Sequence, residues 1–142
     1  INTINIVVLM LKITKKIEYA LIVLRHLNEH KENGVSFSAK EISSIYSLPL
    51  DNLAKTMQNL VRLNYLTSFK GSKGGYTINE NLDDTSLRDF VESLEGPIGL
   101  VDCILEKNCL VEENCNIKSP IIRVNDNLKY ALSSILMSDI VK

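Results

Sequence analysis

Two helical patterns separated by a proline break, with a glycine-rich hairpin after them, constrain the fold of this chain most strongly. Ser38, followed three residues later by Glu41, has the spacing of a capping box and predicts a short helix over residues 39–46. Ser47-Leu48-Pro49 ends that helix, because proline disfavours helical geometry in the residue before it. A longer helix is predicted from about Leu50 to Asn64. The two segments therefore form a pair of helices joined by a tight turn.

An earlier helix and a later hairpin complete this unit. From Thr14 to His30 the apolar residues recur at steps of three and four, which gives one apolar face made of Ile17, Ala20, Leu21, Leu24 and Leu27. Residues 65–69 and 76–78 are rich in strand formers, and the glycines and lysines of residues 70–75 supply a turn between them. This order predicts a winged helix-turn-helix, in which the second helix of the turn enters the major groove of DNA and the hairpin lies on the backbone or minor groove.

The second helix of the turn has one apolar and one polar side. The predicted buried side consists of Leu53, Met57, Leu60 and Leu63. The predicted exposed side consists of Asn52, Lys55, Thr56, Asn59 and Arg62. Residues 52–79 contain no acidic side chain, so they form either a solvated basic face or a surface that contacts a polyanion. Under the second interpretation, base contacts come from the helix and backbone contacts from the hairpin. The predicted DNA-binding residues are Asn52, Lys55, Thr56, Asn59, Arg62, Lys70, Gly71 and Lys73.

The second half of the chain predicts a cysteine-bearing loop between two helices. A helix is expected from Thr85 to Leu94, and residues 101–117 show no clear period. Ser119 as N-cap and Pro120 at the first helical position predict a last helix that runs to about Ile140. Steps of three and four along it give a narrow, coiled-coil-like seam of Ile121, Val124, Leu128, Ala131 and Ile135. This seam predicts a homodimer interface, with packing inside one chain as the alternative.

Charge divides the chain in the same way. The net charge of −1 combines ten basic and six acidic residues between Met10 and Glu80 with six basic and eleven acidic residues after it. We expect a mainly α-helical protein with a small β-hairpin: a possible upstream extension over residues 1–9, a DNA-binding region over 10–80, and a cysteine loop with a dimerisation helix over 81–142. The longest apolar stretch, at residues 6–11, is too short to span a membrane and lacks the flanks of a signal peptide, so a cytoplasmic protein is expected.

All three cysteines lie within thirteen residues, at Cys103, Cys109 and Cys115. An odd number without a secretion signal argues against a disulfide framework. Three unrelated buried thiols are one alternative, but such cysteines usually occupy apolar elements rather than a polar loop. Thiolates suit zinc or an iron–sulfur cluster, and five intervening residues leave room for a group larger than one ion. Either would need a fourth ligand from elsewhere.

Several motifs together resemble the Rrf2 (Rrf-two) family of bacterial regulators, whose members include IscR, NsrR and SufR. The resemblance extends from Leu11 to about Lys142. Its signatures are Ile13-Thr14-Lys15 with Tyr19-Ala20-Leu21, Lys40-Glu41-Ile42, Gly71 with Gly74-Gly75-Tyr76, and the three cysteines after Leu94-Glu95-Gly96. The run LEGPIGLV at residues 94–101, followed by Asp102-Cys103, is most similar to the Suf-regulator branch.

The resemblance implies a homodimer that binds a palindromic operator in double-stranded DNA and an iron–sulfur cluster, either 2Fe–2S or 4Fe–4S. Two positions depart from the family: Lys118 replaces a ligand histidine of the IscR type, and Lys70 replaces the arginine before the first wing glycine. In nitric-oxide-sensing members an aspartate on the first helix of the other subunit completes the cluster, and Glu18 occupies the matching position. A solvated carboxylate at a helix start is the alternative for Glu18. His26 and His30, one turn apart, are weaker candidates for metal binding.

The function expected from these observations is a transcriptional regulator, acting as a repressor, that senses iron–sulfur status and controls cluster-assembly genes. The first alternative is a nitric-oxide- or iron-responsive repressor of the same family. The second is a protein-interaction module whose cysteine loop binds zinc. An enzyme is not expected, because the sequence lacks a phosphate-cradling loop and a nucleophile–base pair.

Overall fold

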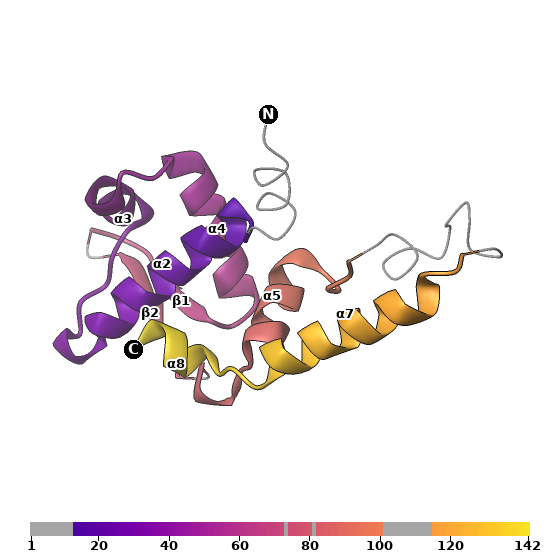
Figure 1. Ribbon diagram of the computed structural model, residues 1–142. Coiled ribbons are helices and arrows are strands. Elements are labelled where there is room, and N and C mark those ends of the chain that lie inside the picture. The colour runs from indigo at the N-terminus through magenta and orange to yellow at the C-terminus, as the bar shows by residue number, and fades with distance from the viewer. Residues whose placement is uncertain (1–12, 73, 81, 101–114) are drawn as a thin grey trace. The chain divides into compact units, whose positions relative to one another are not determined.

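The computed structural model describes residues 13–72, 74–80, 82–100 and 115–142, which divide into two compact units, one ending at Asn79 and the other beginning at Glu80. The described elements are mostly helices, with one two-stranded antiparallel sheet (Figure 1), so the predicted fold class is confirmed. The first unit contains α2 (Lys15–Glu29), the 3-10 turn η1 (Lys31–Asn33), α3 (Ala39–Tyr46), α4 (Leu50–Arg62), β1 (Leu66–Phe69) and β2 (Gly75–Ile78). The second contains η2 (Leu82–Asp84), α5 (Leu87–Glu95), α7 (Lys118–Ser133) and α8 (Met137–Val141).

Side-chain caps begin the first two helices. The Thr14 hydroxyl accepts a hydrogen bond from the backbone N–H of Ile17 at 3.3 Å and starts α2. The predicted capping box is confirmed at α3: Ser38 Oγ accepts from the Glu41 N–H at 3.1 Å, and Glu41 Oε1 accepts from the Ser38 N–H at 3.3 Å. Removing such a cap costs about 1 kcal/mol of stability, so these contacts help to set where the helices begin.

The turn between α3 and α4 uses a left-handed residue and a proline. Ser47 adopts φ 55° and ends α3, while the Leu48 N–H donates to the Ser43 carbonyl at 3.0 Å. Pro49, with φ −61° and ψ 120°, is the N-cap of α4, where its missing N–H costs no helical hydrogen bond. The chain therefore leaves α3 and enters α4 within three residues.

The core of the first unit lies where α2, α3 and α4 pack together. α2 and α3 both contact α4, and α4 also contacts β1 (Figure 1). Each fully buried apolar side chain contributes about 1.5–3 kcal/mol relative to exposure. Leu53, Met57 and Leu60 of α4 are completely buried, whereas Leu63 at its C-cap is half-buried. The other buried apolar residues are Ile17, Ala20, Val23, Leu24, Leu27, Ile42, Tyr65 and Leu66.

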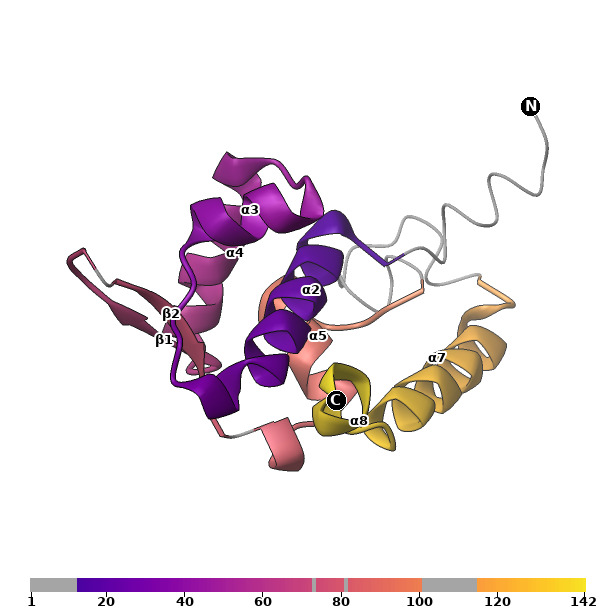
Figure 2. The same cartoon turned by 90° about the vertical axis from the view of Figure 1, so that its left-hand side faces the viewer.

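The hairpin is attached to the segment before α3. β1 and β2 pair in the register Leu66–Ile78 to Phe69–Gly75, and the hairpin extends away from α4 (Figure 2). On its other side, Tyr76 exchanges two backbone hydrogen bonds with Phe37, at 2.8 and 3.2 Å. A Cβ on Gly75 would lie 2.8 Å from the Phe37 carbonyl carbon, so only glycine permits this approach. We call β1, β2 and the turn between them the wing.

The predicted last helix is wrong at both ends. α7 begins at Lys118 rather than at Pro120. Pro120 fits inside the first turn because the first N–H groups of a helix make no helical hydrogen bond, so its missing N–H costs none. The Ile121 N–H makes the first helical bond, to the Ile117 carbonyl at 2.9 Å. It ends at Ser133. Beyond it, Ile135 accepts from the Leu87 N–H at 2.7 Å, and Met137 donates to the Thr85 carbonyl at 2.8 Å. These bonds take the place of further helical ones, so Ile135 lies outside α7.

α7 leaves much of the predicted seam uncovered in a single chain. Val124 is 52% exposed, Ala131 is exposed, and Ile121 and Leu128 are half-buried. In this second unit α5 packs on α7 and α8 on η2, around the buried side chains of Leu82, Phe90, Met137 and Val141. Across the described parts of the chain, no helix is long and apolar enough to cross a membrane.

Candidate nucleic-acid interface

A surface pocket of about 340 Å³ lies between the start of α2 and the polar side of α4. Both elements belong to the first unit and pack directly on each other. The residues that line the pocket share polar or cationic side chains: Lys15, Lys16, Tyr19, Asn52, Lys55, Thr56 and Asn59. None of these seven residues is acidic. The pocket therefore offers amide groups and positive charge together, which is the combination that contacts with bases and phosphates require.

The polar side of α4 is largely as the sequence predicts. Asn52, Lys55 and Arg62 are exposed, and Asn59 is half-buried. The Arg62 guanidinium donates to Asn59 Oδ1, which orients that amide. Asn52, Lys55 and Asn59 line the same pocket, so the structure brings together three of the predicted base-contacting residues.

The prediction that Thr56 is exposed is wrong. Its side chain is 4% exposed, and Thr56 Oγ1 donates to the Asn52 carbonyl at 2.9 Å. Threonine in the middle of a helix commonly bonds back to the carbonyl four residues earlier, and this bond turns the hydroxyl inward. Thr56 therefore contributes to the floor of the pocket rather than to a surface that reaches bases.

Three residues of α2 that were not predicted to contact DNA also line the pocket: Lys15, Lys16 and Tyr19. They lie in the first turns of α2, where the positive end of the helix dipole also favours anions. Lys15 forms an ion pair with Glu18 at 3.0 Å, and this hydrogen bond and charge raise the pKa of Lys15 above its ordinary value. The signal in the sequence was the pair of lysines directly after the N-cap Thr14.

The wing presents a second exposed basic position. Lys70 and Gly71 are exposed at its tip, and Gly71 has φ 100°, a conformation that favours glycine. Lys73, predicted to contact the DNA backbone, lies outside the described residues. Gly74 is also required for packing, because a Cβ there would lie 2.6 Å from the Phe69 carbonyl oxygen.

The predicted cluster ligands are described only in part. Cys115 is half-buried and carries a free thiol, whereas Cys103 and Cys109 lie outside the described residues. Glu18 is half-buried in the first turn of α2, and its carboxylate is engaged by Lys15. Within the described ranges, no three His, Cys, Asp or Glu side chains come together as a metal site.

His26 and His30 form part of an aromatic cluster. His26 is 5% exposed, its Nδ1 lies 2.8 Å from the Tyr46 hydroxyl, and its ring meets Phe37 edge-on at 4.5 Å. His30 Nδ1 is bonded to the His26 carbonyl at 2.8 Å, and the two rings are 4.4 Å apart. This aromatic cluster connects the end of α2 with α3 and with the strand-like segment that holds the wing. His26 Nε2 is buried and has no hydrogen-bond partner among the described residues.

The buried imidazole predicts that stability falls in mild acid. Burial lowers the pKa of His26 below 6.5, and His30 lowers it further, while Glu29 partly opposes both. The unfolded chain therefore binds more protons than the folded chain as the pH falls below about 6.5, so the free energy of unfolding decreases there. Urea denaturation at pH 5.5 and 7.5 measures this difference. His26→Phe, which keeps a ring but cannot titrate, should show a smaller difference; an equal one would contradict the assignment.

The chain matches a known protein family over nearly its whole length. The profile of the Rrf2 family, described as an iron-dependent transcriptional regulator, matches residues 13–142. The chain belongs to the Rrf2 family. It is therefore a member of a family of transcriptional regulators that bind DNA.

Solved structures of other proteins agree with this fold. The chain is similar to CymR (YrzC), the global cysteine regulator of B. subtilis, with 27% identity, a TM-score of 0.68, and coverage of 92% of this chain and 96% of that one. A protein from Listeria innocua matches at 24% identity and a TM-score of 0.73, covering 92% of this chain and 85% of that one. IscR of T. potens matches at 23% identity and a TM-score of 0.65, covering 92% of this chain and 86% of that one.

Proposed function

We propose that this Rrf2 protein is a homodimeric repressor that binds a palindromic operator and senses iron–sulfur status through Cys103, Cys109 and Cys115. The DNA-binding part of this proposal rests on the pocket where the first turn of α2 meets the polar side of α4. Asparagine can pair with adenine and lysine can approach guanine, each worth about 1–3 kcal/mol of discrimination. Asn52, Lys55 and Asn59 supply these groups, while Lys16 and Lys70 supply charge for phosphates.

Removing single charges tests this division. Lys16→Ala should weaken binding to every duplex and reduce the slope of log affinity against log salt by about one, because one phosphate contact is lost. Lys55→Ala should also lower the preference for the operator over other sequences by about 1–3 kcal/mol. Fluorescence titrations at several salt concentrations, using an operator selected from a random duplex pool, measure both effects.

Lys31→Ala is the matched control for those titrations. Lys31 lies beyond the opposite end of α2, roughly 22 Å along the helix from the pocket, so its removal should leave the salt slope unchanged. If Lys16→Ala and Lys31→Ala weaken binding equally, the pocket is not the DNA contact. The same titrations give the stoichiometry, expected to be two chains for each operator.

The homodimer is supported by the uncovered side of α7. Val124 and Ala131 are exposed in one chain, and Ile117, just before the helix, is 53% exposed. Apolar residues at steps of three and four along a helix are covered in solution when a second helix packs on them. A two-fold dimer that binds a palindrome has its two recognition helices one DNA turn apart, about 34–36 Å, or a multiple of that.

The three cysteines of the second half are suitable ligands for an iron–sulfur cluster. Three thiolates are soft ligands of the kind that bind iron–sulfur clusters or zinc, and Glu18 of the second subunit is the proposed fourth ligand. A bound cluster would supply a group that responds to oxidants or nitric oxide. A carboxylate is a harder, more labile ligand than thiolate, and Glu18 lies beside Lys15 in the DNA-binding pocket's own helix. Gain or loss of that ligand would therefore act directly on the start of α2.

The gene targets proposed for this regulator are those of iron–sulfur cluster assembly. Residues 94–101, which read LEGPIGLV, carry this assignment through their similarity to the Suf-regulator branch. A second candidate, a regulator that works without a cluster, is favoured by the structural similarity to a protein described as a cysteine regulator. The two differ in whether the purified protein contains iron and sulfide.

A further inference from the structure

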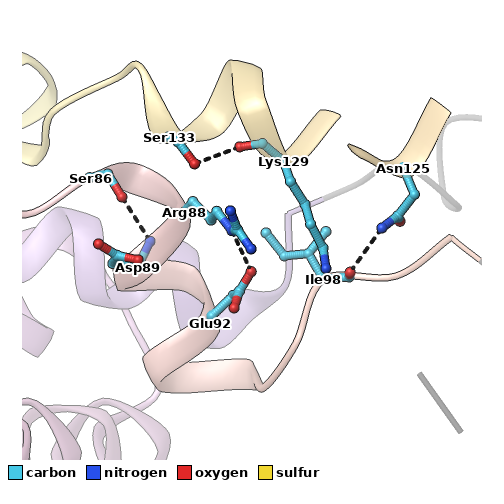
Figure 3. A network of polar contacts seen from close by, with 8 residues as sticks. All are labelled: Ser86, Arg88, Asp89, Glu92, Ile98, Asn125, Lys129 and Ser133. Atoms are coloured by element: carbon cyan, nitrogen blue, oxygen red, sulfur yellow. Dashed lines mark hydrogen bonds and ion pairs between the residues drawn. The ribbon is translucent and has the colours of Figure 1, made fainter. Parts of the chain in front are cut away.

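Asn125, in the middle of α7, is a buried polar side chain that belongs to no site described above. It is 1% exposed. Its Oδ1 accepts a hydrogen bond from the backbone N–H of Leu100 at 3.0 Å, and its Nδ2 donates to the backbone carbonyl of Ile98 at 3.5 Å. Figure 3 shows this amide directed from α7 toward the segment that follows α5. One side chain thus binds both the N–H of Leu100 and the carbonyl of Ile98, in a stretch of backbone that has no regular secondary structure.

The chemistry of this contact is specific to an amide. A buried polar group costs stability unless it is hydrogen-bonded, and Asn125 is satisfied only while Ile98 and Leu100 stay beside it. Both partners are backbone groups, so the contact fixes the course of the chain rather than the packing of particular side chains. A leucine of similar size would fill the space but would leave the Leu100 N–H without this acceptor.

The contact lies at one flank of the cysteine-bearing segment. Cys103 comes three residues after Leu100, and Cys115 comes three residues before α7 begins at Lys118. Asn125 is seven residues into α7, so its attachment point is about 10 Å along the helix from that beginning. Residues 100 and 115, if unrestrained, could separate by up to about 50 Å. α7 therefore holds both flanks of the segment near one another, one through the chain and the other through Asn125.

We propose that Asn125 is a positioning residue that brings the two flanks of the cysteine-bearing segment together for ligand binding. This inference rests on the proposed cluster function. Ligands drawn from both flanks must be gathered before they can share one cluster, and a restraint already present in the folded protein lowers the entropy lost on binding. The same contact would transmit strain at the ligands to α7, the proposed dimer helix.

The test compares Asn125→Ala with Asn127→Ala, the matched change at an exposed asparagine on the same helix. Asn125→Leu is the second variant, because it keeps the volume of the buried side chain. In the apo protein, amide exchange at Leu100 should become about tenfold faster in both Asn125 variants and remain unchanged in Asn127→Ala. In the anaerobically purified protein, loss of iron to a chelator should also become about tenfold faster in the Asn125 variants alone.

The two readouts separate this inference from the proposed function. Unchanged Leu100 exchange in both Asn125 variants would overturn the inference and leave the cluster function intact. Faster Leu100 exchange with an unchanged rate of iron loss would also overturn it, because the contact would then be structural only. A wild-type protein that contains neither iron nor sulfide would instead overturn the proposed function, and with it the positioning role.

Discussion

Gly75→Val is expected to release the wing and to lower the free energy of unfolding by about 3 kcal/mol or more. Any Cβ at this position would lie 2.8 Å from the carbonyl carbon of Phe37, 2.9 Å from its oxygen and 3.0 Å from its nitrogen. These are backbone atoms that cannot rotate away, and Gly75 also has φ 153°. Relief of the clash must break the two hydrogen bonds between Phe37 and Tyr76, so affinity for DNA should fall with stability.

Urea denaturation and operator titration measure the two consequences of Gly75→Val. Gly34→Ala is the matched control, because Gly34 has φ 63° but a methyl group on it would meet no atom within 4 Å beyond its chain neighbours. That change should cost only about 1–2 kcal/mol, the penalty of a left-handed conformation for a residue with a Cβ. It should also leave affinity for DNA unchanged. Equal losses of stability in the two variants would show that contact with Phe37 is not what requires glycine at position 75.

If the proposed cluster is present, the anaerobically purified protein is brown, and Cys115→Ser is expected to weaken or abolish that colour. Serine has nearly the shape of cysteine but supplies no thiolate, so a cluster held by three cysteines loses a strong ligand. Cys103→Ser and Cys109→Ser should have the same effect. Absorption spectra with iron and sulfide assays measure the loss, and circular dichroism shows whether the fold is retained. Zinc in stoichiometric amount without sulfide in the wild type would contradict the cluster and favour a zinc site.

The fourth ligand is tested by the same measurements on Glu18→Ala. Its carboxylate is half-buried beside Lys15, whereas Glu32 on η1 is exposed and provides a control of the same chemistry. Loss of a hard, labile ligand should make the cluster more easily lost without abolishing it, by about tenfold or more in the rate of iron release. Glu32→Ala should behave as the wild type does. A wild-type rate in Glu18→Ala would exclude this carboxylate as a ligand.

Most of the first unit was predictable because its signals are local. The capping box of Ser38 and Glu41, the break at Pro49 and the apolar periodicity of α2 depend on residues within one or two turns of each other. The structure confirms them, except that Leu21 of the predicted α2 face is only half-buried. The hairpin was predictable for the same reason, since its turn residues lie between two short runs of strand formers. The family resemblance drew on these local motifs, and the profile match over residues 13–142 confirms the family.

What depended on long-range contacts was not predictable. The end of α7 is decided by backbone groups of Thr85 and Leu87, about fifty positions earlier, which pair with Met137 and Ile135. Thr56 is buried because α4 packs on α2, whereas periodicity alone placed it on the exposed side. Its bond to the Asn52 carbonyl is local and satisfies the hydroxyl once it is buried.

The sequence by itself determined which segments of the first unit become its α-helices, because caps, proline and apolar spacing act over a few residues. Only the tertiary structure decided that Lys15 and Lys16 lie beside Asn52 and Lys55, and that Asn125 holds the backbone of Ile98 and Leu100. The physical reason is the same in both cases. Contacts between residues 25 or more positions apart form only when packing of the core brings their helices together, and no local pattern records which polar groups then meet.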